Sequence, residues 1–329
     1  MTTAQATALA MIWVVLPLVW LALLRWRTGR LTWRLALYPV VPVLWVAFVT
    51  QAPPSDPALL AATGRATLMG LAIWGLLSGV WLIGTLTRNH SIMDIAYPLT
   101  PWAVTGLAWV QGGAERSPHA LVLLALMSVW AWRLSGYIAL RYLPHGEEAR
   151  YARWRERGGR HWAWWSYFQI YLTQGVLVWI WTWPIALALG ASQPQPAWLA
   201  AAIVVWLIGF VFEAGGDLQM HRFRTNRANA GQVMDRGLWA WCRHPNYFGE
   251  ALTWLSYGLF ALAAPWGWLG LPMVALVFWF MNQGSALSMT ERYMLKTKPG
   301  YADYMARTPA FFPRPPRRDG LRPPASDDR

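Results

Sequence analysis

Long apolar stretches alternate with short polar segments along almost the whole chain. An apolar window of about 17 to 25 residues is long enough to cross a bilayer as a helix. The pattern therefore predicts an all-α, polytopic integral membrane protein. We expect this protein to have about nine transmembrane helices, at approximately 8–25, 34–51, 67–87, 95–112, 118–140, 166–189, 197–217, 247–264 and 267–288.

Basic residues gather in alternate connecting segments. If the amino terminus lies outside, the inner segments hold 25 of the 28 Lys and Arg residues, while Arg65 and Arg116 lie outside and Arg133 falls within a span. This asymmetry follows the positive-inside rule and predicts an odd number of spans. The net charge of +13 is then a topology signal that also attracts anionic lipid headgroups. Nucleic acid is not an expected partner, because the arginines are scattered and no reading module is present.

Composition agrees with a membrane protein and helps to divide the chain. Hydrophobic residues make up 56% and charged residues 13%, and the mean hydropathy is +0.27. We expect a two-helix extension at 1–65, a catalytic membrane domain at 66–316 and a disordered Pro-rich tail at 317–329. No metal site is predicted, because His221 and His244 are far apart and no HExxH or paired-Cys spacing occurs.

Polar side chains within the spans gather at the predicted inner ends. Lipid cannot satisfy such groups, so they usually face protein, water or a ligand. Asn246, Glu250 and Trp254 recur every four residues, as do Glu213 and Asp217, so each set shares one helical face. The clustering predicts a cavity open to the cytoplasm. The alternative interpretations are that these residues are interfacial anchors or that they pair only with one another.

The segment between the seventh and eighth spans, HRFRTNRANAGQVMDRGLWAWCRHP, is rich in Arg and Asn. Guanidinium groups bind phosphate bidentately, and backbone N–H groups can add an anion-binding nest. The chain has no Walker A loop and no GxGxxG after a strand, so any nucleotide would be held by a helical, non-Rossmann architecture. A solvated positive-inside loop is the alternative.

Four segments together resemble the steroid 5-alpha-reductase-like group of bacterial membrane proteins. They are NHSIMD, WAWRLSGYIALR, FEAGGDLQMHRFRTNRANAGQVMDRGLWAWCRHPNYFGEALTW and TERYMLKTKPGYADYMARTPAFFPRPP, and the resemblance covers roughly 70–316. It implies a steroid-reductase-like helical bundle in the bacterial inner membrane, with a cofactor cavity on the cytoplasmic side. It also implies an oxidoreductase that uses NADPH to reduce a carbon–carbon double bond conjugated to a ketone in a lipophilic, steroid- or isoprenoid-like substrate.

The resemblance also assigns roles to individual residues. Asn246, Glu250 and Trp254 match the cofactor-contacting Asn-x-x-Gly-Glu-x-x-x-Trp pattern of the family. Asp217 and Arg224 resemble the acidic and basic residues of its phosphate and ribose loop. The remaining residues that the resemblance places around the cofactor are Tyr137, Glu213, Arg243, His244, Tyr247 and Glu291; Arg133 and Tyr137 match the segment facing nicotinamide, and Glu213 stands where animal steroid reductases have Asn.

One position departs from the animal steroid reductases. In those enzymes a Tyr stands three residues before the Arg that Arg133 matches. That Tyr pairs with a Glu and binds the substrate ketone. In this chain the same position is Trp130. An indole N–H can donate a hydrogen bond but cannot exchange a proton as a phenol does. We expect Asp94, protonated because partial burial raises its pKa or acting through a water molecule, and Tyr97 to supply the donors for the carbonyl oxygen.

Two other functions remain open from sequence. Isoprenylcysteine carboxyl methyltransferases, which use S-adenosylmethionine, look similar around RHPxYxG. Those enzymes generally carry a Glu pair near their carboxyl-terminal motif, whereas here Glu291 is followed by Arg292, which favours a phosphate-bearing cofactor. A non-enzymatic lipid transporter or scaffold is the third interpretation, although no internal repeat of the transporter kind is visible.

Overall fold

The computed structural model describes residues 55–111, 117–192, 195–283 and 285–316, with a few isolated positions before residue 49. The predicted spans at 8–25 and 34–51 and the tail at 317–329 lie outside these continuous ranges. Within the described ranges the chain is helical and contains no strand, so the all-α prediction is confirmed there. The chain divides into two compact units: unit 1 is Met1–Leu199 with Tyr257–Met273, and unit 2 is Ala200–Ser256 with Val274–Arg329.

Three described helices are long and apolar enough to cross a membrane. They are α4 (Pro57–Leu86), α6 (Pro118–Tyr142) with its continuation η2 (Leu143–His145), and α11 (Pro196–Thr225). Membrane association is therefore supported by length and composition, while the full number of spans stays a prediction. The shorter helices α5 (Ile92–Gln111) and α13 (Pro245–Ala261) lie at two further predicted spans.

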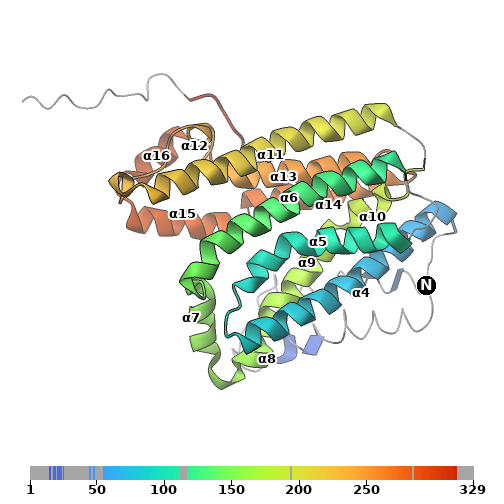
Figure 1. The fold of residues 1–329 in the computed structure, drawn as a ribbon, viewed down its shortest axis with the longest axis horizontal. Helices are drawn as coiled ribbons and strands as arrows, with labels where there is room; N and C mark the ends of the chain where they lie inside the picture. The colour runs from blue at the N-terminus through green and yellow to red at the C-terminus, as the bar shows by residue number, and fades with distance from the viewer. Residues whose placement is uncertain are drawn as a thin grey trace, which may run out of the picture. The chain divides into compact units, whose positions relative to one another are not determined.

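In unit 1, α5 packs against both α4 and α6 (Figure 1). Local sequence explains where these helices begin. The side chain of Asp56 accepts a hydrogen bond from the Leu59 backbone N–H, and that of Ser117 accepts one from Ala120, and each cap is followed by proline at the first helical position. These caps fix the start of α4 and of α6.

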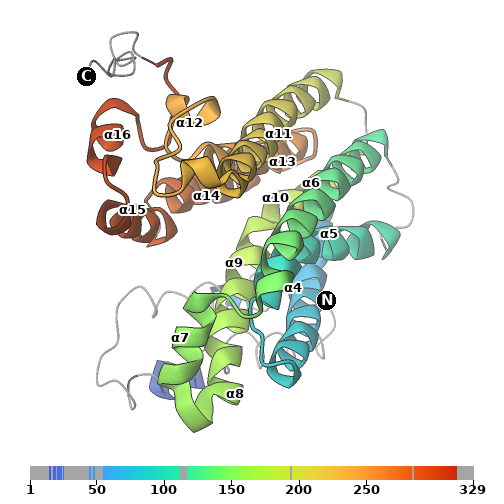
Figure 2. The same cartoon turned by 60° about the vertical axis from the view of Figure 1, so that its left-hand side comes forward.

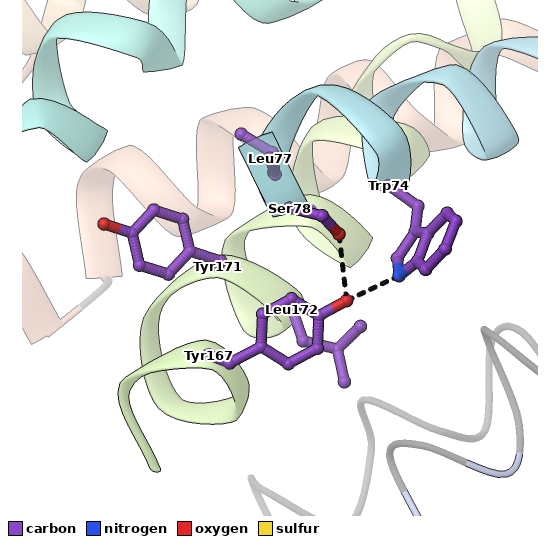
Figure 3. Close-up of a pocket in the computed structure, with 7 residues that line it drawn as sticks. Trp74, Leu77, Ser78, Tyr167, Tyr171 and Leu172 are labelled. Carbon is purple, nitrogen blue, oxygen red and sulfur yellow. Dashed lines mark hydrogen bonds between the residues drawn. The ribbon is translucent and has the colours of Figure 1, made fainter. Parts of the chain in front are cut away.

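The predicted span at 166–189 is divided into short pieces. It contains the end of α8 (Trp162–Ser166), a π-helix η4 (Tyr167–Leu172), α9 (Thr173–Trp181) and α10 (Trp183–Ala188). Beside the π-helix lies a small pocket, lined by residues of α4 and of the segment 167–175. Its Tyr167 hydroxyl accepts a hydrogen bond from Trp74 Nε1 at 2.5 Å and lies 3.1 Å from Ser78 Oγ, so these polar groups satisfy one another (Figure 3).

Three short helical segments join α6 to the rest of unit 1. After η2 come α7 (Ala149–Gly158) and η3 (Gly159–His161). Gly146 and Gly159 lie at the two ends of α7 with φ of 77° and 56°. Glycine adopts these angles without the steric cost of a Cβ, which allows the chain to turn sharply on each side of α7.

Unit 2 consists of most of α11 and α13 with the carboxyl-terminal helices (Figure 2). Between α11 and α13 come η5 (Arg227–Asn229) and α12 (Leu238–Trp241). The predicted span at 267–288 comprises η6 (Gly267–Gly270), α14 (Leu271–Gln283) and the start of α15 (Ser285–Thr297), and α16 (Tyr301–Arg307) follows.

Candidate functional site

Two helices of unit 2, α11 and α13, cross at glycines. A Cβ on Gly209 would lie 2.8 Å from the carbonyl oxygen of Gly249, and a Cβ on Gly249 would overlap the backbone nitrogen of Glu213. A Cβ on Gly216 would lie 3.2 Å from the ring of Pro245. Small residues let two helix backbones approach closely, as in many membrane helix pairs. The crossing therefore brings the polar face of α11 against the amino-terminal turns of α13.

The predicted acidic and amide residues meet at this crossing. Asp217 is 7% exposed, and its Oδ1 accepts a hydrogen bond from Asn246 Nδ2 at 3.3 Å. Glu213 lies one turn earlier on α11 and is 2% exposed. On α13, Glu250 is half-buried and Trp254 is buried. The two sets of residues that the sequence placed on separate helical faces thus belong to adjoining helices.

Arg224 extends the polar face of α11 into the following loop. It lies seven residues after Asp217, which is about 10 Å along the same helical face, and it is exposed in the last turn of α11. The loop beyond is ordered by amides, because Asn226 accepts from the Ala228 N–H and Asn229 donates to the Phe223 carbonyl. The exposed guanidinium of Arg224 thus lies within two turns of the buried acid.

Three other predicted residues form an ion-paired group at the start of α13. Arg243 Nε donates to Glu291 Oε1 at 2.8 Å, and His244 Nε2 lies 3.2 Å from the same oxygen. Arg243 Nη1 also donates to the carbonyl oxygens of Met305 and Thr308. The guanidinium therefore holds α15 and the segment after α16 together, and most of its donors are already engaged.

The environment of Glu291 makes a pH dependence testable. Burial alone would raise the pKa of Glu291, but the hydrogen bonds and positive charge of His244 and Arg243 lower it to about 2 from an ordinary value of 4.5. Because the folded pKa is the lower one, this stabilising contribution is complete above about pH 4.5 and is lost as the pH falls toward 2.

We therefore expect Glu291→Gln to lower the free energy of unfolding by about 1.5 kcal/mol near neutral pH. Thermal unfolding of the detergent-solubilised protein at several pH values measures this. The midpoint of the variant should approach that of the parent as the medium is acidified. A difference that is the same at every pH would contradict the ion-paired role of Glu291.

In unit 1, the predicted residue Asp94 lies at the centre of another polar cluster. Asp94 Oδ2 pairs with Arg150 at 2.8 Å, and Asp94 Oδ1 accepts a hydrogen bond from the Tyr151 hydroxyl at 2.6 Å. Tyr151 is 1% exposed; burial, and then the nearby carboxylate of Asp94, raise its pKa well above the ordinary value, so it stays a donor. Burial raises the pKa of Asp94, as predicted, although the charge of Arg150 and the hydrogen bond from Tyr151 oppose this rise. Both carboxyl oxygens accept hydrogen bonds here, and the donating role of Asp94 stays a prediction.

The other predicted residues of unit 1 lie on α5 and α6. The ring of Tyr97 packs edge-on against Trp130 and Trp181, with centroid distances of 6.4 and 6.2 Å. Arg133 and Tyr137 are half-buried and lie one turn apart on α6. Trp130 itself is fully buried among these side chains, so the position that departs from the animal enzymes is a packing position in this structure.

The pair between Tyr151 and Asp94 can be tested by a double-mutant cycle. Tyr151→Phe and Asp94→Asn should each destabilise the protein, and the double variant should lose less than the sum by about 1.5 kcal/mol. Thermal or denaturant unfolding of the four proteins gives this coupling energy. Strictly additive losses would show that the hydrogen bond does not contribute.

The predicted residues therefore form two groups, one in each unit. Sequence reasoning missed Arg150 and Tyr151, because their segment, GEEARYARWRER, was interpreted only as a positively charged inner loop. The sequence signal that could have indicated this cluster is the adjacent Arg and Tyr in that loop, of which the Tyr is buried in the structure. No group of three or more His, Cys, Asp or Glu side chains suited to a metal occurs among the residues that the structure describes.

With this geometry in view, comparison with known proteins identifies a family. A family model described as a protein of unknown function, DUF1295, matches residues 80–308, which include both polar groups. This chain belongs to the DUF1295 family. The family is the steroid 5-alpha-reductase-like group that the sequence motifs predicted, so the resemblance is confirmed at that level.

Two curated relatives of this DUF1295 protein are similar over different lengths. An uncharacterised protein of Schizosaccharomyces pombe is 27% identical over 281 residues, which cover 75% of this chain and 77% of the yeast protein. The nickel-cobalt-cadmium resistance protein NccN of Alcaligenes xylosoxydans xylosoxydans is 27% identical over 124 residues, covering 37% of this chain and 55% of NccN. No solved structure matches the chain.

Proposed function

We propose that this protein is a membrane-embedded oxidoreductase that uses NADPH to reduce a carbon–carbon double bond conjugated to a ketone in a lipophilic, steroid- or isoprenoid-like substrate. The observation that carries the proposal is the crossing of α11 and α13. There the acid Asp217 contacts the amide Asn246 on the family's cofactor-contacting pattern. The cofactor side of the protein is proposed to be cytoplasmic, on the basis of the charge asymmetry of the loops.

The chemistry of the α11–α13 residues fits a dinucleotide. Carboxylates and amides such as Asp217 and Asn246 hydrogen-bond to ribose hydroxyls and to a carboxamide, and the exposed guanidinium of Arg224 is suited to phosphate. Arg243 is less suited to phosphate, since Glu291 and two carbonyl oxygens already occupy its donors. We therefore assign phosphate binding to the end of α11 and a positioning role to Arg243.

The proposed reaction needs a hydride for the β carbon, a hydrogen-bond donor for the enolate oxygen and a proton, supplied by water, for the α carbon. NADPH, when bound, supplies the hydride to the β carbon of the enone. Negative charge then develops on the carbonyl oxygen, and a donor placed there stabilises it. The Tyr97 hydroxyl is the candidate donor, because the single proton of the Tyr151 hydroxyl is already donated to Asp94.

One observation favours the alternative function, a membrane methyltransferase that uses S-adenosylmethionine. Arg243 and His244 both contact Glu291, and an Arg-His-Pro motif is also shared with membrane methyltransferases that use S-adenosylmethionine. A positively charged cofactor would be attracted by the acids Glu213, Asp217 and Glu250, whereas NADPH needs the arginines. The two functions therefore predict different ligands for one site.

Turnover tests the proposed activity directly. Purified protein in detergent or nanodiscs should oxidise NADPH only when a lipophilic enone is added, and mass spectrometry should find the saturated ketone with two added hydrogens. The matched control is the corresponding saturated ketone as substrate. Methyl transfer from S-adenosylmethionine to a lipid acceptor, with no NADPH oxidation for any enone, would overturn the proposal.

A further inference from the structure

In the sequence, an apolar segment lies on each side of the helix α7. It follows the candidate membrane span Pro118–His145 and precedes the apolar run that begins at Trp162. In Figure 1, α7 turns away from the end of α6 and runs across its direction. A polar helix of ten residues in this position must lie at the surface of the membrane, because its charged side chains cannot be satisfied in hydrocarbon.

The inner side of α7 is fixed to unit 1 by charged groups. Arg155 Nε pairs with Glu147 at 2.9 Å, and Arg150 pairs with Asp94 and Glu148. Tyr151 is buried on the same side. These contacts hold the helix in one orientation, so its opposite side faces away from the protein.

That outer side carries a row of arginines. Arg153 and Arg157 are four residues apart on α7 and so share one helical face, and Arg160 follows in η3, beyond the turn at Gly159; all three are exposed. Glu156, which is also exposed, is the acidic residue within this stretch of the sequence. Trp164, in the next turn of the chain, is 36% exposed, and exposed tryptophans are typical of the membrane–water interface.

We propose that the exposed arginines Arg153 and Arg157 of α7, together with Arg160 of η3, bind the phosphate headgroups of anionic lipids at the inner membrane surface. The inference is independent of the proposed reductase activity. Charge complementarity selects anionic over zwitterionic lipid, since each Arg near the surface adds attraction to a negatively charged leaflet. Guanidinium groups also match phosphate geometry, and Trp164 would lie beside the acyl chains.

The test is lipid binding by the full-length protein in detergent. Short-chain phosphatidylglycerol is titrated while thermal unfolding is followed, with phosphatidylcholine of the same chain length as the comparison. The parent should bind phosphatidylglycerol more tightly than phosphatidylcholine. The variant Arg153→Gln/Arg160→Gln should lose about fivefold in affinity for each arginine removed, and Glu156→Gln should bind more tightly than the parent.

A matched control is Arg236→Gln, which removes an exposed positive charge in unit 2 and should leave the affinity unchanged. Three results would each overturn the proposal. They are equal binding of the two lipids, equal loss in the Arg236 variant and the double variant, and displacement of the lipid by inorganic phosphate at similar concentrations, which would indicate a site for a free anion.

Discussion

Replacing Gly249 by alanine is expected to destabilise the protein by about 3 kcal/mol or more and to remove cofactor binding. The added methyl group would overlap both the backbone nitrogen of Glu213 and the carbonyl oxygen of Gly209. Backbone atoms of a helix cannot yield as the end of a flexible side chain can. Relief therefore requires α11 and α13 to separate, which would also part Asp217 from Asn246.

Thermal unfolding of the solubilised protein measures this loss. Gly215→Ala is the matched control on α11, because its new Cβ would meet only the end of the Leu238 side chain at 3.1 Å. Alanine is also favoured over glycine in a helix by up to about 1 kcal/mol. The control should therefore be neutral or slightly stabilising. A Gly249 variant as stable as the Gly215 variant would show that the helices do not cross as described.

Asn246→Ala and Glu250→Ala are each expected to weaken NADPH binding by about 10- to 100-fold while leaving the protein folded. A hydrogen bond to a charged or strongly polar partner contributes about 1.5–3 kcal/mol, and both side chains are half-buried rather than packed in the core. Titration of NADPH by fluorescence gives the dissociation constants.

The matched control is Gln283→Ala, which removes an exposed amide near the end of α14. It should bind NADPH as the parent does. If all three variants retain the parental affinity, Asn246 and Glu250 do not belong to the cofactor site. If all three lose it equally, the effect arises from general destabilisation, and unfolding curves would reveal this.

Much of the helical arrangement follows from the apolar windows. The helices α4, α6 and α11 lie where the windows at 67–87, 118–140 and 197–217 were expected. The window at 166–189 did not predict the π-helix at Tyr167–Leu172 or the break at Thr182. Hydropathy reports which segments avoid water, and it carries no information about the register of backbone hydrogen bonds within them.

The candidate site was predictable only in part. Spacing of four residues placed Glu213 with Asp217, and Asn246 with Glu250, on single helical faces, and the structure brings Asp217 and Asn246 into contact. The partners of Asp94 were not predictable, because Arg150 and Tyr151 are 56 and 57 residues away in sequence. Such contacts depend on how α7 folds back toward α5, and periodicity describes one helix at a time.

The central claim is that the crossing of α11 and α13 forms a site for NADPH. Thermal-shift titration of the purified protein with NADPH and, separately, with S-adenosylmethionine tests it most directly, since a ligand that binds only the folded state raises the unfolding midpoint. We predict a saturable rise with NADPH that is lost in Asn246→Ala. A rise with S-adenosylmethionine alone would contradict the account.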